Sequence, residues 1–153
     1  MDDFFGAGKD GVPAREGVES LRQFQARLKG GVRPLDLYVT LYGHDLDLPI
    51  ADHLAECDVI TFWTWLSKDL VDLPQNIDRV KSLAPNKRIL LGLYMYDYGA
   101  GAPMPLERMQ YQAELGLTWL KQGRIDGLIF LASCACDLEL DTVAWARELI
   151  AGL

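Results

Sequence analysis

Aromatic rings and a carboxylate gather at the end of one apolar run in the chain. Residues 90–103 read LLGLYMYDYGAGAP, so the run gives way to Tyr94, Tyr96 and Tyr98 around Asp97. A buried strand that only packs a core keeps Val, Ile and Leu to its end. Rings with hydroxyl tips beside a carboxylate are instead suited to a polar ligand. The stretch predicts a ligand site, and rings that simply fill a wide core are the alternative.

Other carboxylates also stand where predicted strands end. Asp2 and Asp3 lie near the start of the chain, and Asp45 follows the strand predicted for residues 35–42. Glycoside hydrolysis uses two carboxyl groups, about 5–5.5 Å apart in retaining enzymes and about 6.5–9.5 Å apart in inverting ones. We predict catalytic roles for Asp2, Asp3 and Asp97. The alternatives are a solvated terminus for Asp2 and Asp3 and a hydrogen-bonded loop for Asp97.

A second set of residues has the chemistry to hold a sugar. Flat aromatic faces match the apolar faces of sugar rings, while imidazole and carboxylate groups orient hydroxyls. The predicted substrate-binding residues are the platforms Tyr42, Trp63, Trp65 and Tyr96 and the orienting groups His44 and Asp45.

Metal and cofactor motifs are weak. The chain has only two histidines, and His44 with Asp45 and Asp47 is a sparse set of ligands for a divalent cation. Cys134 and Cys136 lack the second pair of ligands that a structural zinc site needs. We therefore predict no metal and no cofactor.

The elements that must position these residues alternate regularly. Four apolar runs predict short strands, and each is followed by a segment with helical periodicity. The predicted strands are residues 35–42, 58–65, 88–96 and 126–133, and an earlier helix covers residues 18–28. This order predicts an α/β protein with a parallel sheet and right-handed crossovers.

The two faces of the predicted strands differ. Leu91, Leu93 and Met95 share one face of the third strand, while Tyr94 and Tyr96 share the other. An aliphatic face suits the helix-packed outside of an α/β barrel, and an aromatic face suits its lumen, where sites form at the carboxyl ends of strands. The pattern favours β-α units forming a partial, half TIM barrel. A flavodoxin-like doubly wound sheet is the alternative.

Composition narrows the classes of partner. The chain has 153 residues and a formal net charge of −7, which argues against unaided binding to nucleic acid or an anionic membrane. No apolar run approaches the length of a membrane span, and the first residues lack the pattern of a signal peptide. These features predict a single soluble domain over residues 1–153, cytoplasmic by default.

At the level of strand and helix rhythm, the chain resembles the carboxyl-terminal half of glycoside-hydrolase-like TIM-barrel proteins. The likeness rests on DDFF (2–5), FWTW (62–65), GLYMYDYG (92–99) and AWARELI (144–150). It implies a carbohydrate ligand and a catalytic acid at the position of Asp2 or Asp3. It also implies that the chain is a fragment of a larger barrel, and it leaves open whether the isolated chain is active.

A half barrel has sheet edges that invite a partner. We therefore expect a homodimer, or association with a separate amino-terminal half. Two other functions stay open at this point, namely a non-enzymatic assembly module and a small-ligand-binding flavodoxin-like domain.

Overall fold

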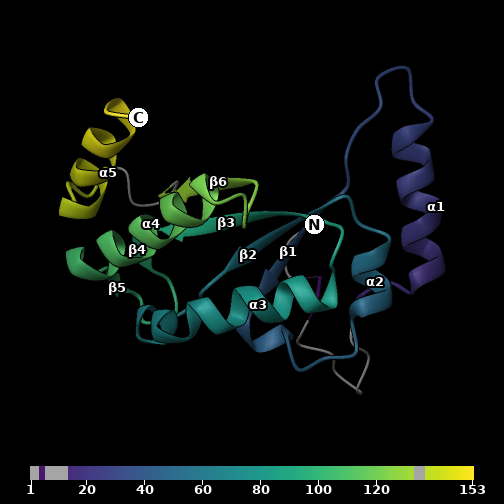
Figure 1. Ribbon diagram of the computed structural model, residues 1–153, viewed down its shortest axis with the longest axis horizontal. Coiled ribbons are helices and arrows are strands. Elements are labelled where there is room, and N and C mark those ends of the chain that lie inside the picture. Colours follow the sequence, from purple (N-terminus) through teal and green to yellow (C-terminus); the bar gives the residue numbers. More distant parts are fainter. Residues whose placement is uncertain (1–3, 6–13, 133–136) are drawn as a thin grey trace. The chain divides into compact units, whose positions relative to one another are not determined.

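The computed structural model describes residues 4, 5, 14–132 and 137–153 (Figure 1). Every predicted strand and helix is present. The strands are β1 (Tyr38–Tyr42), β2 (Val59–Trp63), β3 (Arg88–Tyr94), β4 (Tyr96–Asp97), β5 (Ala102–Pro103) and β6 (Gly127–Leu131). The α-helices are α1 (Val18–Lys29), α2 (Ala51–Ala55), α3 (Leu73–Leu83), α4 (Leu106–Lys121) and α5 (Asp141–Ala151). Two 3-10 helices, η2 (Gly43–Asp45) and η3 (Ser67–Asp72), follow β1 and β2.

The main sheet has four parallel strands in the order β1-β2-β3-β6. Residues Tyr38 to Tyr42 of β1 stand opposite Val59 to Trp63 of β2. The predicted α/β class and the parallel sheet are therefore confirmed, while the half barrel and the flavodoxin-like sheet stay predictions. The ribbon of β4 and β5 is antiparallel and was not predicted.

The chain divides into two compact units. The first comprises Met1–Trp63 and Pro74–Leu90, and the second comprises Thr64–Leu73 and Leu91–Leu153. The assignment of residues 1–153 to a single domain stays a prediction.

The core of the first unit is built from strand and helix residues with helical or alternating spacing. Every residue of β2 is buried, as a strand covered on both faces requires. Side chains from β1 and from the helices bury their apolar atoms completely, and each contributes about 1.5–3 kcal/mol. They include Val39, Leu41, Ile50, Leu54, Ile77 and Val80.

Charged residues at the amino ends of the strands in the first unit form a network. Lys29 pairs with Asp36 at 2.5 Å and with Asp58 at 3.2 Å, and Arg88 also pairs with Asp36. The Asp58 carboxylate accepts the backbone N–H of Leu37 at 2.7 Å. These contacts give Asp36 and Asp58 a structural role in holding α1 against the start of the sheet.

In the second unit, α4 packs closely because it carries a glycine on its buried face. A Cβ atom built on Gly116 would lie 2.7 Å from Cδ2 of Leu128 and 3.1 Å from Cδ2 of Leu91. The helix ends at Lys121, and Gly123 follows its cap residue with a φ of +64°, the left-handed conformation that commonly terminates a helix.

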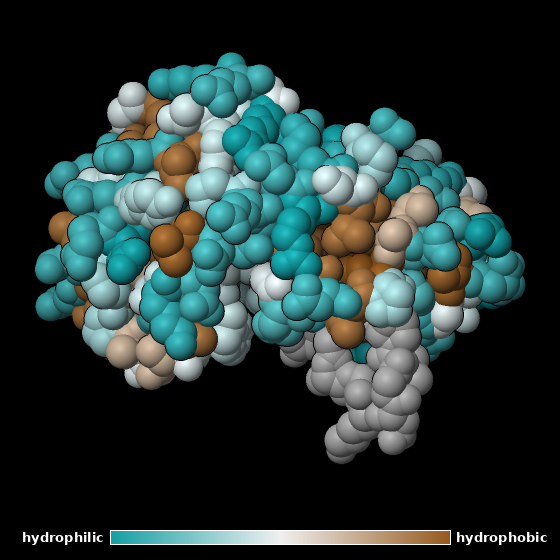
Figure 2. All heavy atoms as spheres, turned by 60° about the horizontal axis from the view of Figure 1, so that its bottom comes forward, coloured by the Kyte–Doolittle hydropathy of each residue, from teal (hydrophilic) through white to brown (hydrophobic). Residues whose placement is uncertain are grey.

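On the face shown in Figure 2, hydrophilic residues predominate and hydrophobic residues emerge in separate patches. Among the described residues, no helix is both long enough and apolar enough to cross a membrane.

Candidate functional site

A group of aromatic side chains suited to ligand binding lies in the second unit. It consists of Trp65, Tyr94, Tyr96 and Tyr98, which we call the aromatic cluster. The Trp65 ring meets Tyr94 edge to face at 6.1 Å and lies 6.4 Å from Tyr98 at a tilt of 30°. Tyr98 in turn lies 4.8 Å from Tyr94 and 5.3 Å from Tyr96. The rings therefore form one continuous group at the end of β3.

The members of the aromatic cluster differ in exposure. Trp65 is 43% exposed, although indole rings are usually well buried in folded domains. Tyr94 is 5% exposed, and Tyr96 and Tyr98 are half-buried. Trp65 thus presents its ring to solvent while the tyrosines support it from within.

Backbone contacts explain why β3 stops where the cluster begins. The Gln112 side chain of α4 donates a hydrogen bond to the Tyr94 carbonyl at 2.9 Å. The Thr142 hydroxyl of α5 donates to the Met95 carbonyl at 2.7 Å. Side chains therefore take over the backbone acceptors at this point, and the chain turns into the short β4–β5 ribbon.

Asp97 connects the two loops that carry the cluster. One carboxylate oxygen accepts the backbone N–H of Ser67 at 3.0 Å, and the other accepts the backbone N–H of Ala100 at 3.0 Å. The Gly99 N–H donates to the Trp65 carbonyl at 3.1 Å. The loop after β2 and the loop after β4 are consequently tied together by hydrogen bonds.

These contacts also determine the charge state of Asp97. Burial alone would raise the pKa of the Asp97 carboxyl, since the side chain is 5% exposed. Hydrogen bonds from the Ser67 side chain and from the backbone of Ala100, Ser67 and Gly99 outweigh burial and lower that pKa below its ordinary value. Asp97 is therefore an ionised group at neutral pH, with its oxygens occupied by donors.

Gly99 fits tightly against the platform. A Cβ atom built there would lie 2.5 Å from Cδ2 of Leu66 and 2.7 Å from Cδ1 of Trp65. Only a residue without a side chain lets the two loops approach this closely.

The first unit holds the other predicted binding residues. The Tyr42 and His44 rings stack at 5.3 Å with an interplanar angle of 9°. Asp45 is 1% exposed and accepts the Tyr42 backbone N–H at 2.9 Å, and its other oxygen lies 3.6 Å from Nε2 of His44. Trp63 stands opposite Tyr42 in the sheet and donates its indole N–H to the Thr61 hydroxyl at 3.1 Å.

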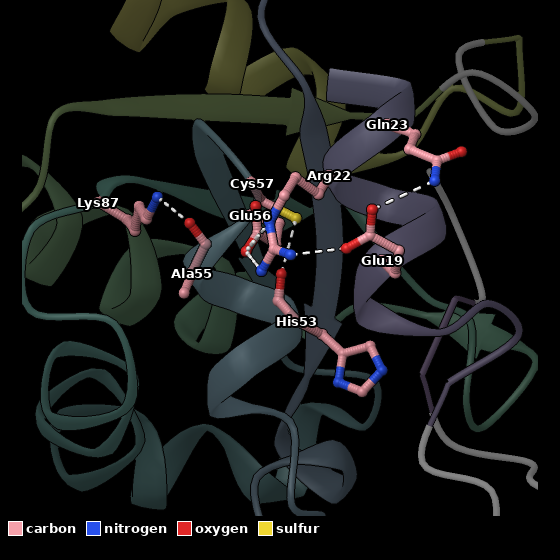
Figure 3. A network of polar contacts seen from close by, with 8 residues as sticks. All are labelled: Glu19, Arg22, Gln23, His53, Ala55, Glu56, Cys57 and Lys87. Carbon is pink, nitrogen blue, oxygen red and sulfur yellow. Dashed lines mark hydrogen bonds and ion pairs between the residues drawn. The ribbon is translucent and has the colours of Figure 1, made fainter. Parts of the chain in front are cut away.

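His53 and Cys57 belong to the structural interior of the first unit. The Cys57 thiol donates to the His53 carbonyl at 3.5 Å, and Figure 3 shows the His53 ring pointing away from the surrounding network of Arg22 and Glu56. The same ring meets Phe5 edge to face at 6.3 Å. Over the described residues, no group of three or more His, Cys, Asp or Glu side chains is arranged to hold a metal ion.

The predicted site residues divide into those outside the described part of the chain and those that form two separate groups. Asp2 and Asp3 lie outside the described residues, as do Cys134 and Cys136, so the catalytic roles of Asp2 and Asp3 stay predictions. The structure brings Trp65 and Tyr96 together with Tyr94 and Tyr98, and separately brings Tyr42, His44 and Asp45 together.

The contacts of Ser67, Gly99 and Ala100 were missed by sequence reasoning. The only sequence signal for them is the small-residue run Gly99-Ala100-Gly101-Ala102, which is typical of a tight turn after an acidic residue.

No protein-family model matches this chain, and neither a curated protein nor a solved structure resembles it significantly.

Proposed function

We propose that this chain binds carbohydrate at the aromatic cluster, with the Trp65 indole as the main stacking platform. The observation that carries the proposal is the exposure of Trp65, 43%, on a pair of loops tied together by hydrogen bonds. Stacking on a sugar ring requires an exposed aromatic ring whose loop is held in place before the ligand binds.

The chemistry of the neighbouring residues supports the same ligand class. Indole and phenol faces match the apolar faces of sugar rings, while tyrosine hydroxyls exchange hydrogen bonds with sugar hydroxyls. Tyr96 and Tyr98 are half-buried, so part of each side chain stays accessible beside Trp65. A neutral glycan is favoured over an acidic one, since the chain carries a net charge of −7.

The proposal is tested by calorimetric titration of the chain with neutral oligosaccharides such as cellotetraose and chitotetraose. We expect Trp65→Ala to weaken binding by at least about tenfold, because stacking and ring burial are both lost. Trp119→Phe is the control. Trp119 lies on α4, is 4% exposed and is covered by the Arg124 guanidinium, so its ring is not available to a ligand. Equal affinities in the protein and its Trp65→Ala variant would contradict the proposal.

Hydrolysis stays a prediction for Asp2, Asp3 and Asp97. A direct assay is release of reducing ends from the bound oligosaccharide, compared between the protein and a variant with Asp2→Asn and Asp3→Asn together. Loss of turnover with retained binding would support catalysis by these residues. Binding without any turnover in either protein would leave a carbohydrate-binding function alone.

An assembly function is a second candidate, favoured by β6. This strand is last in the sheet order, and its sequence Gly-Leu-Ile-Phe-Leu has no charged residue. All five of its residues are half-buried, whereas those of β2 are fully buried. An apolar strand of this kind at the end of a sheet is suited to pairing with another chain.

A further inference from the structure

We propose that Asp97 is a positioning residue, which holds the Trp65 ring ready for a ligand by fastening the loop that carries it. The inference rests on the proposed carbohydrate site but concerns how that site is formed. This role needs no contact between Asp97 and the ligand, and it is independent of the catalytic role predicted from the sequence.

The hydrogen bonds of Asp97 and of the turn that follows it hold the chain at the platform and two residues beyond it. On the carboxyl side of Trp65, the Ser67 N–H donates to Asp97 at 3.0 Å. The Trp65 carbonyl itself accepts the Gly99 N–H at 3.1 Å, and Ala100 N–H donates to the second oxygen of Asp97. Residues 65–67 are thus held by hydrogen bonds to the Asp97 side chain and to the backbone of the turn that follows Asp97.

A neutral isostere would break this arrangement. In Asp97→Asn, one oxygen that accepts an N–H is replaced by an NH₂ group, which is a donor. The new donor faces the N–H of either Ser67 or Ala100, and one of the two loops must move. Because the residue at position 97 is buried, the mismatch cannot be relieved by turning the side chain into solvent.

In Asp97→Asn, the Trp65 ring would no longer be held in place, so it would have to be ordered when the ligand binds. Immobilising one side chain in this way weakens affinity by about 2- to 12-fold. We expect Asp97→Asn to lower the affinity for cellotetraose or chitotetraose within that range, with no change in the set of glycans that bind.

The main experiment measures the motion of the Trp65 indole by ¹⁵N relaxation of its Nε1–H, assigned with Trp65→Phe. We expect an ordered indole in the unchanged protein and a mobile one in Asp97→Asn. Asp58→Asn is the matched control, because Asp58 also accepts a backbone N–H, from Leu37 at 2.7 Å, in the other unit. It should reduce stability and leave the Trp65 indole ordered.

A second measurement covers the case in which Asp97→Asn does not fold. In the unchanged protein, the Asp97 carboxyl carbon, the Ser67 and Ala100 amides and the Trp65 indole N–H are followed by NMR as the pH is lowered. Joint movement of all these signals is expected. An indole that stays ordered in Asp97→Asn, or that ignores the protonation of Asp97, would overturn the positioning role. Absence of oligosaccharide binding by the unchanged protein would instead overturn the proposed function, while the NMR result still decides the role of Asp97.

Discussion

At Asp97, burial and hydrogen bonding act on the pKa in opposite directions, and hydrogen bonding prevails. The pKa of this carboxyl is lower in the folded protein than the value of about 3.9 expected in the unfolded chain. The unfolded state therefore binds more protons in acid. The stabilisation by Asp97 is present above the unfolded pKa and is lost as the pH falls through the folded pKa.

This linkage predicts how Asp97→Asn changes stability. At neutral pH the variant should lose about 1–3 kcal/mol of the free energy of unfolding, because buried donors lose their acceptor. In acid the difference from the unchanged protein should shrink. Urea unfolding at a series of pH values measures both effects. Asp47→Asn, at a side chain that is 84% exposed, should change stability by less than about 0.5 kcal/mol. A constant difference at all pH values would contradict the prediction.

Cys57 shows the opposite case, in which burial dominates. Burial of the thiol raises its pKa to about 11, so almost no thiolate forms near neutral pH. In a variant with Cys134→Ser and Cys136→Ser, we expect no reaction with a chromogenic disulfide reagent at about pH 8 while the protein is folded. Denaturation in guanidinium chloride should release the thiol for complete reaction. Rapid reaction of the folded variant would mean that Cys57 is accessible.

Among the elements, α4 depends on the glycine that follows its last turn. Gly123 has a φ of +64°, which costs a residue with a Cβ atom about 1–2 kcal/mol. Gly123→Ala should lower the free energy of unfolding by about that amount, as measured by urea unfolding. Gly152→Ala is the control at the end of α5, where φ is −96° and the nearest contacts of an added Cβ are at 3.6 Å. A loss of equal size in both variants would point to helix fraying rather than to the left-handed conformation.

The elements themselves were largely predictable, because their periodicity is local in the sequence. Apolar runs identified β1, β2, β3 and β6, although the predicted strands extend beyond the observed ones by up to three residues at one end. At the start of α5, Asp141 is the first helical residue and Leu140 precedes it. The acidic group still lies in the first turn, where the helix dipole favours it.

The candidate site was predictable only in part. Trp65 and Tyr96 were both predicted as platforms for a sugar, and both belong to the aromatic cluster. Asp97 stands between Tyr96 and Tyr98, so in a regular strand its side chain would face the opposite side from theirs. The hydrogen-bond partners of Asp97 therefore depended on where β3 ends. That point is decided by Gln112 and Thr142, which lie on α4 and α5 far along the chain. Contacts of this kind between distant segments leave no periodic signal in the sequence.

On the scale of the whole molecule, the half-exposed apolar strand β6 bears on assembly. We expect the chain to form a homodimer, detected by light scattering over a dilution series down to micromolar concentration. Ile129→Lys should shift the protein to the monomer, since a charge on a terminal strand opposes pairing. Val71→Lys is the control, because Val71 is 65% exposed on η3 of the same unit.

Circular dichroism must show that Ile129→Lys remains folded. A monomer at all concentrations of the unchanged protein would contradict dimer formation. A dimer that tolerates Ile129→Lys would place the contact away from β6.

The hydrogen bonds of Asp97 have a consequence for the engineering of this protein. The segment from Trp65 to Ser67 and the segment from Asp97 to Ala100 are separate in sequence, yet each supplies donors or acceptors that the other requires. An insertion in either segment would misplace atoms that belong to both. Loop libraries that randomise one segment alone should therefore yield few folded members, and a transplant of the Trp65 platform into another scaffold must move the two loops as a pair.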